Sequence, residues 1–323
     1  MTWGNQTFVA EFILLGLSES ETLQRAFFVL FLVVYMIALM GNLCMIVIIR
    51  ISPHLHTPMY FFLSNLSFLD MCYVSVTVPK MLEDFLEGRR HISFSGCMTQ
   101  LFFLIFLAGT EVFLLTIMAY DRYVAICNPL RYSMIVTRKL CVELAVFAWL
   151  AGFLNSFSNT VLVSHLPFCG PNVINHFSCD IPPLLKLSCS DTFINEITIL
   201  IIGIFFGMSS FLLTLVSYIK IIACILKMNT VEGRHKAFST CASHVTVVCL
   251  FYVTATFRYM RPASSYSLDI QDRVVSVLYS IVTPMLNPII YSLRNKEVKR
   301  AVKRLMGKII CLPDREQHFQ TIY

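Results

Sequence analysis

Two carboxylic acids interrupt long apolar stretches of this sequence. Asp70 and Glu111 are each the only charged residue in their stretch. Two buried carboxylates cannot both ionise cheaply without a positive charge nearby, so either one is protonated or a small cation such as sodium lies between them. Asn42 and Asn287 also lie in apolar stretches and would add amide oxygens, which suit a hard cation. The alternative is a hydrogen-bonded network that fixes helix packing.

A third acid, Asp121, is followed directly by Arg122 and Tyr123 at the end of the stretch that holds Glu111. Adjacent residues do not face each other squarely on a helix, although a long arginine side chain can fold back. Such a pair could lock a resting state and release Arg122 when this end of the helix opens. The alternative is that Arg122 extends to lipid headgroups on its own.

The twelve cysteines divide by compartment. Cys97, Cys169, Cys179 and Cys189 fall on the side predicted below to be extracellular, and the other eight lie in apolar stretches or on the cytoplasmic side, where thiols stay reduced. Four cysteines allow three pairings. We predict Cys97–Cys179 with Cys169–Cys189, because the first bridge would hold the middle of segment 164–196 over the helices; Cys97–Cys189 is the alternative. Each bridge would contribute about 3–4 kcal/mol.

Metal binding and catalysis are not indicated. His176, Cys179 and Asp180 could bind a soft metal ion, but a disulfide cysteine beside polar loop residues is the simpler interpretation, and we predict no metal site. The sequence has no phosphate-binding glycine loop and no metal-spaced histidine pair. Segments 220–236 and 294–323 are too short for a catalytic domain. The chain is therefore predicted not to be an enzyme.

The elements that carry these residues are predicted to be membrane-spanning helices. Of the 323 residues, 57% are hydrophobic and 14% charged, against roughly a quarter charged in soluble domains. About 20 helical residues cross a bilayer core. Stretches of that length occur at 26–49, 58–78, 98–120, 140–163, 197–219, 237–257 and 274–293. The predicted fold is an all-α membrane protein, a bundle of seven transmembrane helices.

The distribution of basic residues predicts the orientation. With the N-terminus outside, the cytoplasmic segments hold 17 of the 25 Lys and Arg residues, as the positive-inside rule requires. The predicted parts are an extracellular N-terminus (1–25), a receptor domain (26–293) and a cytoplasmic tail (294–323). This basic surface faces anionic lipid and a cytoplasmic partner, not nucleic acid. No cleavable signal peptide is visible, and Asn5 begins an extracellular glycosylation sequon.

The tail and the seventh stretch carry two further patterns. Apolar residues of the tail alternate with basic ones at helical spacing, which predicts a short amphipathic helix on the inner leaflet, and Cys311 beyond it could carry a lipid. The apolar residues are Val298, Ala301, Val302, Leu305 and Ile309, and the basic ones are Lys299, Arg300, Lys303 and Arg304. In the seventh stretch, Pro284 and Pro288 can form a hinge, with Asn287 satisfying the freed backbone groups.

Five strings in register identify a family resemblance. The sequence reads LHTPMYFFLSNLSFLD (55–70), MAYDRYVAIC (118–127), SYIKI (217–221), KAFSTCASH (236–244) and PMLNPIIYSLRN (284–295). In this order and on these stretches they closely resemble the olfactory receptors, a branch of the rhodopsin-like G-protein-coupled receptors, and the threonine of LHTPMY resembles the tetrapod-type class. The resemblance covers nearly the whole chain from Gly41 to Asn295.

The resemblance implies a mechanism. A small odorant would bind among the outer halves of helices three, five, six and seven, and the inner end of helix six would move outward. A heterotrimeric stimulatory (olfactory-type) G protein would then bind and raise cyclic AMP. It also implies a place in the plasma membrane of sensory neuron cilia, and no cofactor beyond a sodium ion at Asp70 and Glu111. Its implied switch comprises Asp121, Arg122, Tyr123, Tyr218, Asn287, Pro288 and Tyr291. The implied G-protein-facing residues are Lys236, Ser239, Thr240 and His244.

A ligand site can be predicted from side-chain types alone. One face of the third stretch, with residues opposite it, forms an apolar wall with a few hydroxyls, which suits a small, volatile, uncharged molecule. The predicted lining is Leu101, Leu104, Ile105, Ala108, Ile202, Phe206, Tyr252, Ala255, Thr256, Tyr259, Val277 and Ser280. Val253 and Arg258 depart from the family pattern, and Arg258 makes an acidic odorant conceivable.

The main rival interpretation is a seven-helix transporter or channel for a small solute or cation. Transporters usually contain paired repeats with broken helices, and no repeat relates the two halves of this sequence. A retinal protein would need a Schiff-base lysine in 274–293, which contains none. Cyclic AMP production measured against ion flux would discriminate receptor from transporter.

Overall fold

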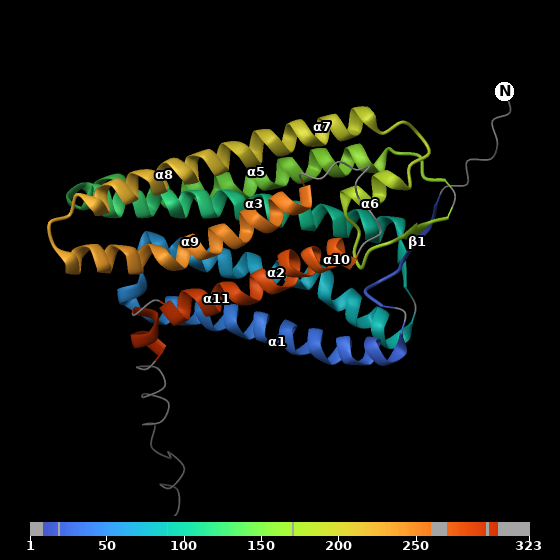
Figure 1. Cartoon of the computed structure of the whole chain (residues 1–323), viewed down its shortest axis with the longest axis horizontal. Helices are drawn as coiled ribbons and strands as arrows, with labels where there is room; N and C mark the ends of the chain where they lie inside the picture. Colours follow the sequence, from blue (N-terminus) through green and yellow to red (C-terminus); the bar gives the residue numbers. More distant parts are fainter. Residues whose placement is uncertain are drawn as a thin grey trace, which may run out of the picture.

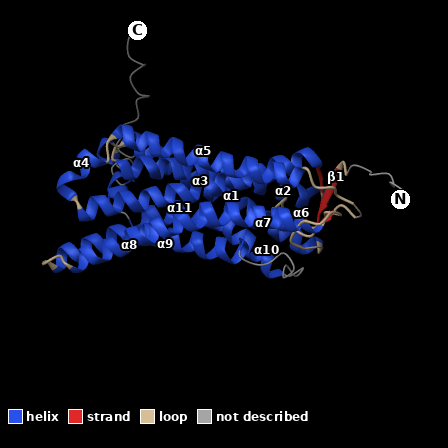
Figure 2. Ribbon diagram, turned by 90° about the horizontal axis from the view of Figure 1, so that it is seen from above, coloured by secondary structure: helices blue, strands red, loops and turns tan. Residues whose placement is uncertain are grey.

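The computed structural model describes residues 9–18, 20–88, 90–169, 171–259, 270–294 and 297–302. Long helices run side by side along one axis, and the described strands lie together at one end, near the N-terminus (Figures 1 and 2). We call this the sheet end, and the opposite end, where Asp121 lies, the Asp121 end. The bundle is therefore polarised, with different structures at its two ends.

The helices fall where hydropathy predicts them. The long ones are α1 (Glu21–Ile51), α2 (Pro58–Glu87), α3 (Phe94–Cys127), α5 (Arg138–Ser164) and α9 (Val231–Tyr259). Two further paths contain a π-helical turn each: α7 (Phe193–Gly203), η3 (Ile204–Met208) and α8 (Ser209–Leu226), then α10 (Ile270–Val277), η5 (Leu278–Val282) and α11 (Thr283–Arg294). Short helices are η1 (Pro53–Leu55), η2 (Pro129–Arg131), α4 (Tyr132–Ile135) and α6 (Ile181–Lys186).

Length and composition allow these helices to cross a membrane. Within the described residues, six helical segments are long and apolar enough, and α9 contributes a shorter apolar part, Cys241–Thr256. Large apolar side chains such as Phe205, Leu213 and Leu154 are more than half exposed on the outside of the bundle. Such a surface would aggregate in water but suits lipid. The seven-helix membrane bundle predicted from the sequence is what the chain forms.

The crossing of α3 and α5 depends on a residue without a side chain. A Cβ placed on Gly152 would clash with the Thr110 hydroxyl and lie 2.8 Å from the Phe106 carbonyl oxygen. Small residues let membrane helices approach this closely and gain van der Waals contact. Most of α3 is consequently buried at the centre of the bundle, whereas α7 and α8 lie at its edge.

A three-stranded sheet that the sequence analysis did not predict covers one end. Its central strand β1 (Glu11–Leu14) pairs antiparallel with β2 (His91–Ser93) and parallel with β3 (Val173–Ile174). Phe12 and Leu14 of β1 are fully buried against the segment that follows α5. Residues 11–14 are thus part of the folded structure at this end of the bundle.

The start of the predicted amphipathic helix is present. Residues 297–302 are helical, with Val298 and Ala301 buried against the main core and Lys299 and Arg300 exposed. The remaining residues of the predicted helix, Lys303, Arg304, Leu305 and Ile309, lie outside the described residues, as do Cys311 and Asn5.

Candidate functional site

The two buried carboxylates lie in one polar centre at mid-bundle. Asn287 on α11 donates hydrogen bonds to both carboxylate oxygens of Asp70 on α2, at 3.2 and 3.0 Å. Glu111 on α3 is close enough to Asp70 for the two carboxylates to interact electrostatically. Both acids are almost completely buried. Oxygens of Glu111 and Asn287 have no hydrogen-bond partner among the described residues, so this centre offers oxygen ligands to a small cation or a proton.

Asn42 joins the same region to the backbone of α11. Pro288 has no N–H, so the carbonyl oxygen of Pro284, four residues earlier, loses its helical donor. The Asn42 side-chain amide donates to that oxygen at 3.1 Å. We expected Asn287 to satisfy this group, and that expectation is wrong because its amide is already bound to Asp70. The freed carbonyl instead fastens α1 to α11.

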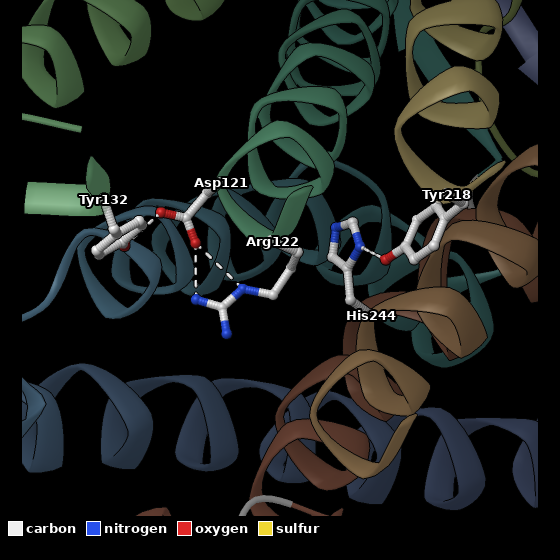
Figure 3. Close-up of polar contacts among 5 residues, drawn as sticks. All are labelled: Asp121, Arg122, Tyr132, Tyr218 and His244. Carbon is white, nitrogen blue, oxygen red and sulfur yellow. Dashed lines mark hydrogen bonds and ion pairs between the residues drawn. The ribbon is translucent and has the colours of Figure 1, made fainter. Parts of the chain in front are cut away.

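At the Asp121 end, the predicted acid–arginine pair is formed. Arg122 folds back and donates to Asp121 Oδ2 through Nε at 3.1 Å and through Nη2 at 2.7 Å (Figure 3). Asp121 Oδ1 accepts a hydrogen bond of 2.7 Å from the hydroxyl of Tyr132 on α4. Both oxygens of the buried carboxylate are therefore occupied. In this structure Arg122 is paired with Asp121 and does not extend freely toward lipid headgroups.

Tyr132 was missed by the sequence analysis. It follows Asp121 by eleven residues, beyond a 3₁₀ turn, and no local spacing rule connects the two positions. Burial, reinforced by the Asp121 carboxylate, raises the pKa of Tyr132 above its ordinary value. Its hydroxyl consequently stays protonated and remains a donor at physiological pH.

A second pair lies beside Arg122. The Tyr218 hydroxyl on α8 is hydrogen-bonded to His244 Nδ1 on α9, and the two rings stack with centroids 5.9 Å apart (Figure 3). His244 is fully buried, so in this arrangement it belongs to the helix contact and not to an exposed docking face. Helices α9 and α8 pack around Ile221, Ile225, Ala237 and Cys241, with Tyr123 against them. Side chains of Lys236, Ser239 and Thr240 lie outside the described part of the structure.

Tyr291 completes the residues predicted to rearrange. Its ring is fully buried on α11, and its hydroxyl has no hydrogen-bond partner among the described residues. Pro288 on the same helix contacts α1 closely, since a Cβ on Gly41 would lie 3.2 Å from its ring. A buried hydroxyl without a partner is costly unless another arrangement satisfies it.

The predicted ligand-lining residues are divided among three buried clusters. Leu104 and Ala108 pack in the main core, where Tyr252 and Ala255 also contact it. Leu101 and Ile105 lie in a second cluster beneath the segment after α5. Val277 packs in a third, and Ser280 donates to the Ser276 carbonyl oxygen at 2.7 Å.

Three other members of that set lie elsewhere. The Phe206 ring contacts Phe113, which is on a different face of α3 from Leu104, and Ile202 is half-buried on α7. Thr256 is exposed, and the side chains of Tyr259 and Arg258 lie outside the described residues.

The cysteines and the segment after α5 organise the sheet end. The structure joins Cys97 to Cys179 and Cys169 to Cys189, the pairing that the sequence favoured. His176 bonds Ser276 on α10 at 3.0 Å, and Asp180 accepts from the Ile181 amide at the start of α6. The side chains of His176 and Asp180 thus make hydrogen bonds within the fold. Among the described residues, no group of three potential ligands could hold a metal ion.

Two arginines that the sequence analysis missed hold the N-terminal segment in place. Arg90 donates to the carbonyl oxygens of Leu15 and Ser18 at 2.8 and 3.0 Å. Arg273 on α10 donates to the Gly16 carbonyl oxygen at 2.9 Å and to the side chain of Asn175. Four parts of the chain that are distant in sequence are thereby tied together over the sheet end.

A further cysteine pair was not expected. Cys127, the last residue of α3, is joined to Cys224 on α8, with Cα atoms 5.8 Å apart. Both fall in the group of cysteines that the sequence analysis expected to stay reduced. The prediction excluded the pair because thiols on the predicted cytoplasmic side are expected to stay reduced.

Comparison with known proteins identifies the family. A family model described as olfactory receptor matches residues 31–308. The chain is 55% identical to mouse olfactory receptor 5AP2, over 95% of this chain and 96% of the relative. It is 53% identical to human olfactory receptor 5A2, over 94% of both, and 51% identical to human olfactory receptor 13C9, over 95% and 98%. The chain therefore belongs to the olfactory receptor family, and it is a multi-pass membrane receptor of the G-protein-coupled class, not an enzyme.

Proposed function

We propose that this receptor binds a small, volatile organic molecule within the half of the bundle at the sheet end and activates a stimulatory G protein of the olfactory type, which raises cyclic AMP. The sheet end is extracellular, with Asn5 glycosylated, and the Asp121 end and tail are cytoplasmic. The excess of Lys and Arg in the segments at the Asp121 end supports this orientation. The membrane is the plasma membrane of sensory neuron cilia.

One observation carries the proposal: Arg122 is held by Asp121, whose other oxygen is held by Tyr132. A closed polar lock at the cytoplasmic end is what a two-state receptor needs in its resting arrangement. The Tyr218–His244 contact holds α8 against α9 beside it. Ligand binding shifts the equilibrium toward an arrangement in which these contacts separate and the G protein binds, with Lys236, Ser239 and Thr240 on the opened face.

The ligand site lies around α3, at the residues predicted to line it. Its chemistry is supported by the apolar side chains of Leu101, Leu104 and Ile105, with few hydroxyls among them. Leu104 and Ala108 belong to the main core cluster, and Tyr252 and Ala255 pack against the same cluster, which supports a ligand site between α3 and α9.

A sodium ion in the polar centre would favour the resting arrangement. Asp70, Glu111, Asn42 and Asn287 would hold it, because several of their buried oxygens accept no hydrogen bond from any described residue. The ion would neutralise the repulsion between the two carboxylates. Opening of α11 at Pro288 would then disperse these ligands and release the ion.

The test is an odorant panel applied to cells that express the full chain, with cyclic AMP and ion flux recorded together. We expect a cyclic AMP response that Arg122→Ala abolishes although the variant reaches the surface. The same panel on Tyr259→Ala and Arg258→Ala should change potency or ligand preference. Ion or solute flux without cyclic AMP would instead identify a transporter or channel and overturn the proposal.

A further inference from the structure

Cys127 and Cys224 meet at the Asp121 end of the bundle with the spacing of a disulfide. Their Cα atoms are 5.8 Å apart, inside the usual range of about 4.4–6.8 Å. Cys127 Sγ also lies 3.6 Å from the carbonyl oxygen of Lys220, one turn before Cys224 on α8. Both side chains are partly exposed, so small reagents can reach them. The two sulfur atoms are thus placed to react with each other.

This pair differs from the other two in its compartment. Cys97–Cys179 and Cys169–Cys189 lie at the sheet end, which is extracellular in the proposed orientation, where disulfides persist. Cys127 and Cys224 lie at the opposite end, where glutathione keeps thiols reduced and disulfides are transient or redox-sensing. No third His, Cys, Asp or Glu among the described residues completes a metal site there. The reducing compartment therefore favours a reversible bond over a structural one.

The position of the pair connects it to the switch. Cys127 lies about two helical turns beyond Asp121 on α3, and Cys224 follows Tyr218 on α8 by a similar distance. Ile221 and Ile225, which are near Cys224 on α8, pack in one cluster with side chains of α9 and with Ile126, which precedes Cys127 on α3. A bond at this point would prevent α8 from moving relative to α3. Tyr218 on α8 would then also stay in place, and its contact with His244 on α9 would be kept.

We propose that Cys127 and Cys224 form a reversible cytoplasmic disulfide that holds the receptor in its resting arrangement and lowers signalling under oxidising conditions. This inference rests on the proposed function for the side of the membrane and for the output. The oxidant is a peroxide: one thiolate attacks hydrogen peroxide and becomes a sulfenic acid, with one oxygen leaving as water. The second thiol attacks that sulfur and releases a second water. Two thiols lose two electrons and two protons, and glutathione reverses the bond by exchange.

The test uses membranes from cells that express the full chain, treated with hydrogen peroxide and then blocked with N-ethylmaleimide. Peptide mapping without reduction should show a peptide linked through Cys127 and Cys224, which later glutathione removes. Ligand-independent guanine-nucleotide exchange on added stimulatory G protein should fall about fivefold or more after peroxide, the lower end of typical coupling. Glutathione should restore it.

Matched variants separate this bond from general oxidation. Cys127→Ser and Cys224→Ser should each make exchange insensitive to peroxide, and the double variant should behave like either one. Cys249→Ser removes an exposed free cysteine of α9 and should respond like the unaltered chain. Absence of the linked peptide, or a linked receptor whose exchange is unchanged or increased, overturns the inference. Absence of any exchange before treatment would instead contradict the proposed function, while the peptide map still decides whether the bond forms.

Discussion

The side-chain amide of Asn42 on α1 lies 3.1 Å from the carbonyl oxygen of Pro284 on α11, and it replaces the donor that Pro288 lacks. We predict that Asn42→Leu destabilises the folded receptor by about 1–2 kcal/mol, because the buried carbonyl is left without a donor. Thermal unfolding in detergent measures this change. Ser158→Ala removes only an intrahelical hydrogen bond to Leu154 and should leave the transition unchanged. Equal transitions for the Asn42 variant and the unaltered chain would mean that this contact contributes nothing.

Tyr132→Phe should raise signalling without ligand. The variant keeps the ring and removes the hydrogen bond to Asp121 Oδ1, which weakens the resting lock by about 1.5 kcal/mol, or about tenfold in the equilibrium between arrangements. Basal cyclic AMP normalised to surface expression is the measurement. Tyr120→Phe on α3, whose side chain is exposed, serves as the control. Unchanged basal cyclic AMP in Tyr132→Phe would show that Tyr132 does not hold the resting state.

Gly152→Ala should impair folding, although alanine favours helices. A Cβ at this position meets Thr110 and the Phe106 carbonyl oxygen, and separation of α3 from α5 should cost about 1–3 kcal/mol. Gly203→Ala is the matched control, because its Cβ would meet nothing within 4 Å. Both variants gain the same helix propensity, so the difference in surface expression isolates the helix contact. Equal expression would contradict the close approach.

Arg273→Ala should loosen the N-terminal segment without unfolding the bundle. The variant removes the contacts through which Arg273 joins Gly16 to Asn175. The backbone amides of Leu15 and Gly16 donate to the carbonyl oxygens of Ile174 and His176, on either side of Asn175. Their hydrogen exchange should accelerate about tenfold, while the amides of α3 stay protected. Lys139→Ala breaks only an exposed ion pair with Glu143 and should change neither. Unaltered exchange at Leu15 and Gly16 would show that Arg273 does not fix this segment.

The transmembrane helices could be predicted because hydropathy measures the property that makes them span a membrane. Their ends could not, since the hydrogen-bond ladder continues after the apolar residues stop. Helix α1 runs over Glu21–Ile51, beyond the predicted 26–49 at both ends. The π-helical turns Ile204–Met208 and Leu278–Val282 also escaped, because one extra residue in a turn barely changes a hydrophobic pattern.

The polar contacts were predictable only where the partners are close in sequence or share a depth in the membrane. Asp121 with Arg122, and Asp70 with Asn287, meet these conditions. Tyr132 and Arg273 do not, because loops of unknown path bring them to their partners. Asn42 was placed in the polar region, but the bond from its amide to the Pro284 carbonyl oxygen was not predicted, since hydropathy gives the depth of a residue and not its neighbours.

Strand β1 lies between two neighbours that are made at very different times. Ile13 pairs with His91 on one side and with Val173 on the other, about 160 residues later. A ribosome adds about 5–20 residues per second, so the second neighbour follows β1 by about 10–30 s. In the proposed orientation, β1 therefore waits on the luminal side of the membrane with an unpaired edge during synthesis. Chaperones, and the enzymes that would attach a glycan at Asn5, could reach it during that interval. A fast-folding domain fused ahead of β1 would share that interval, which makes the start of this chain a sensitive place for a tag.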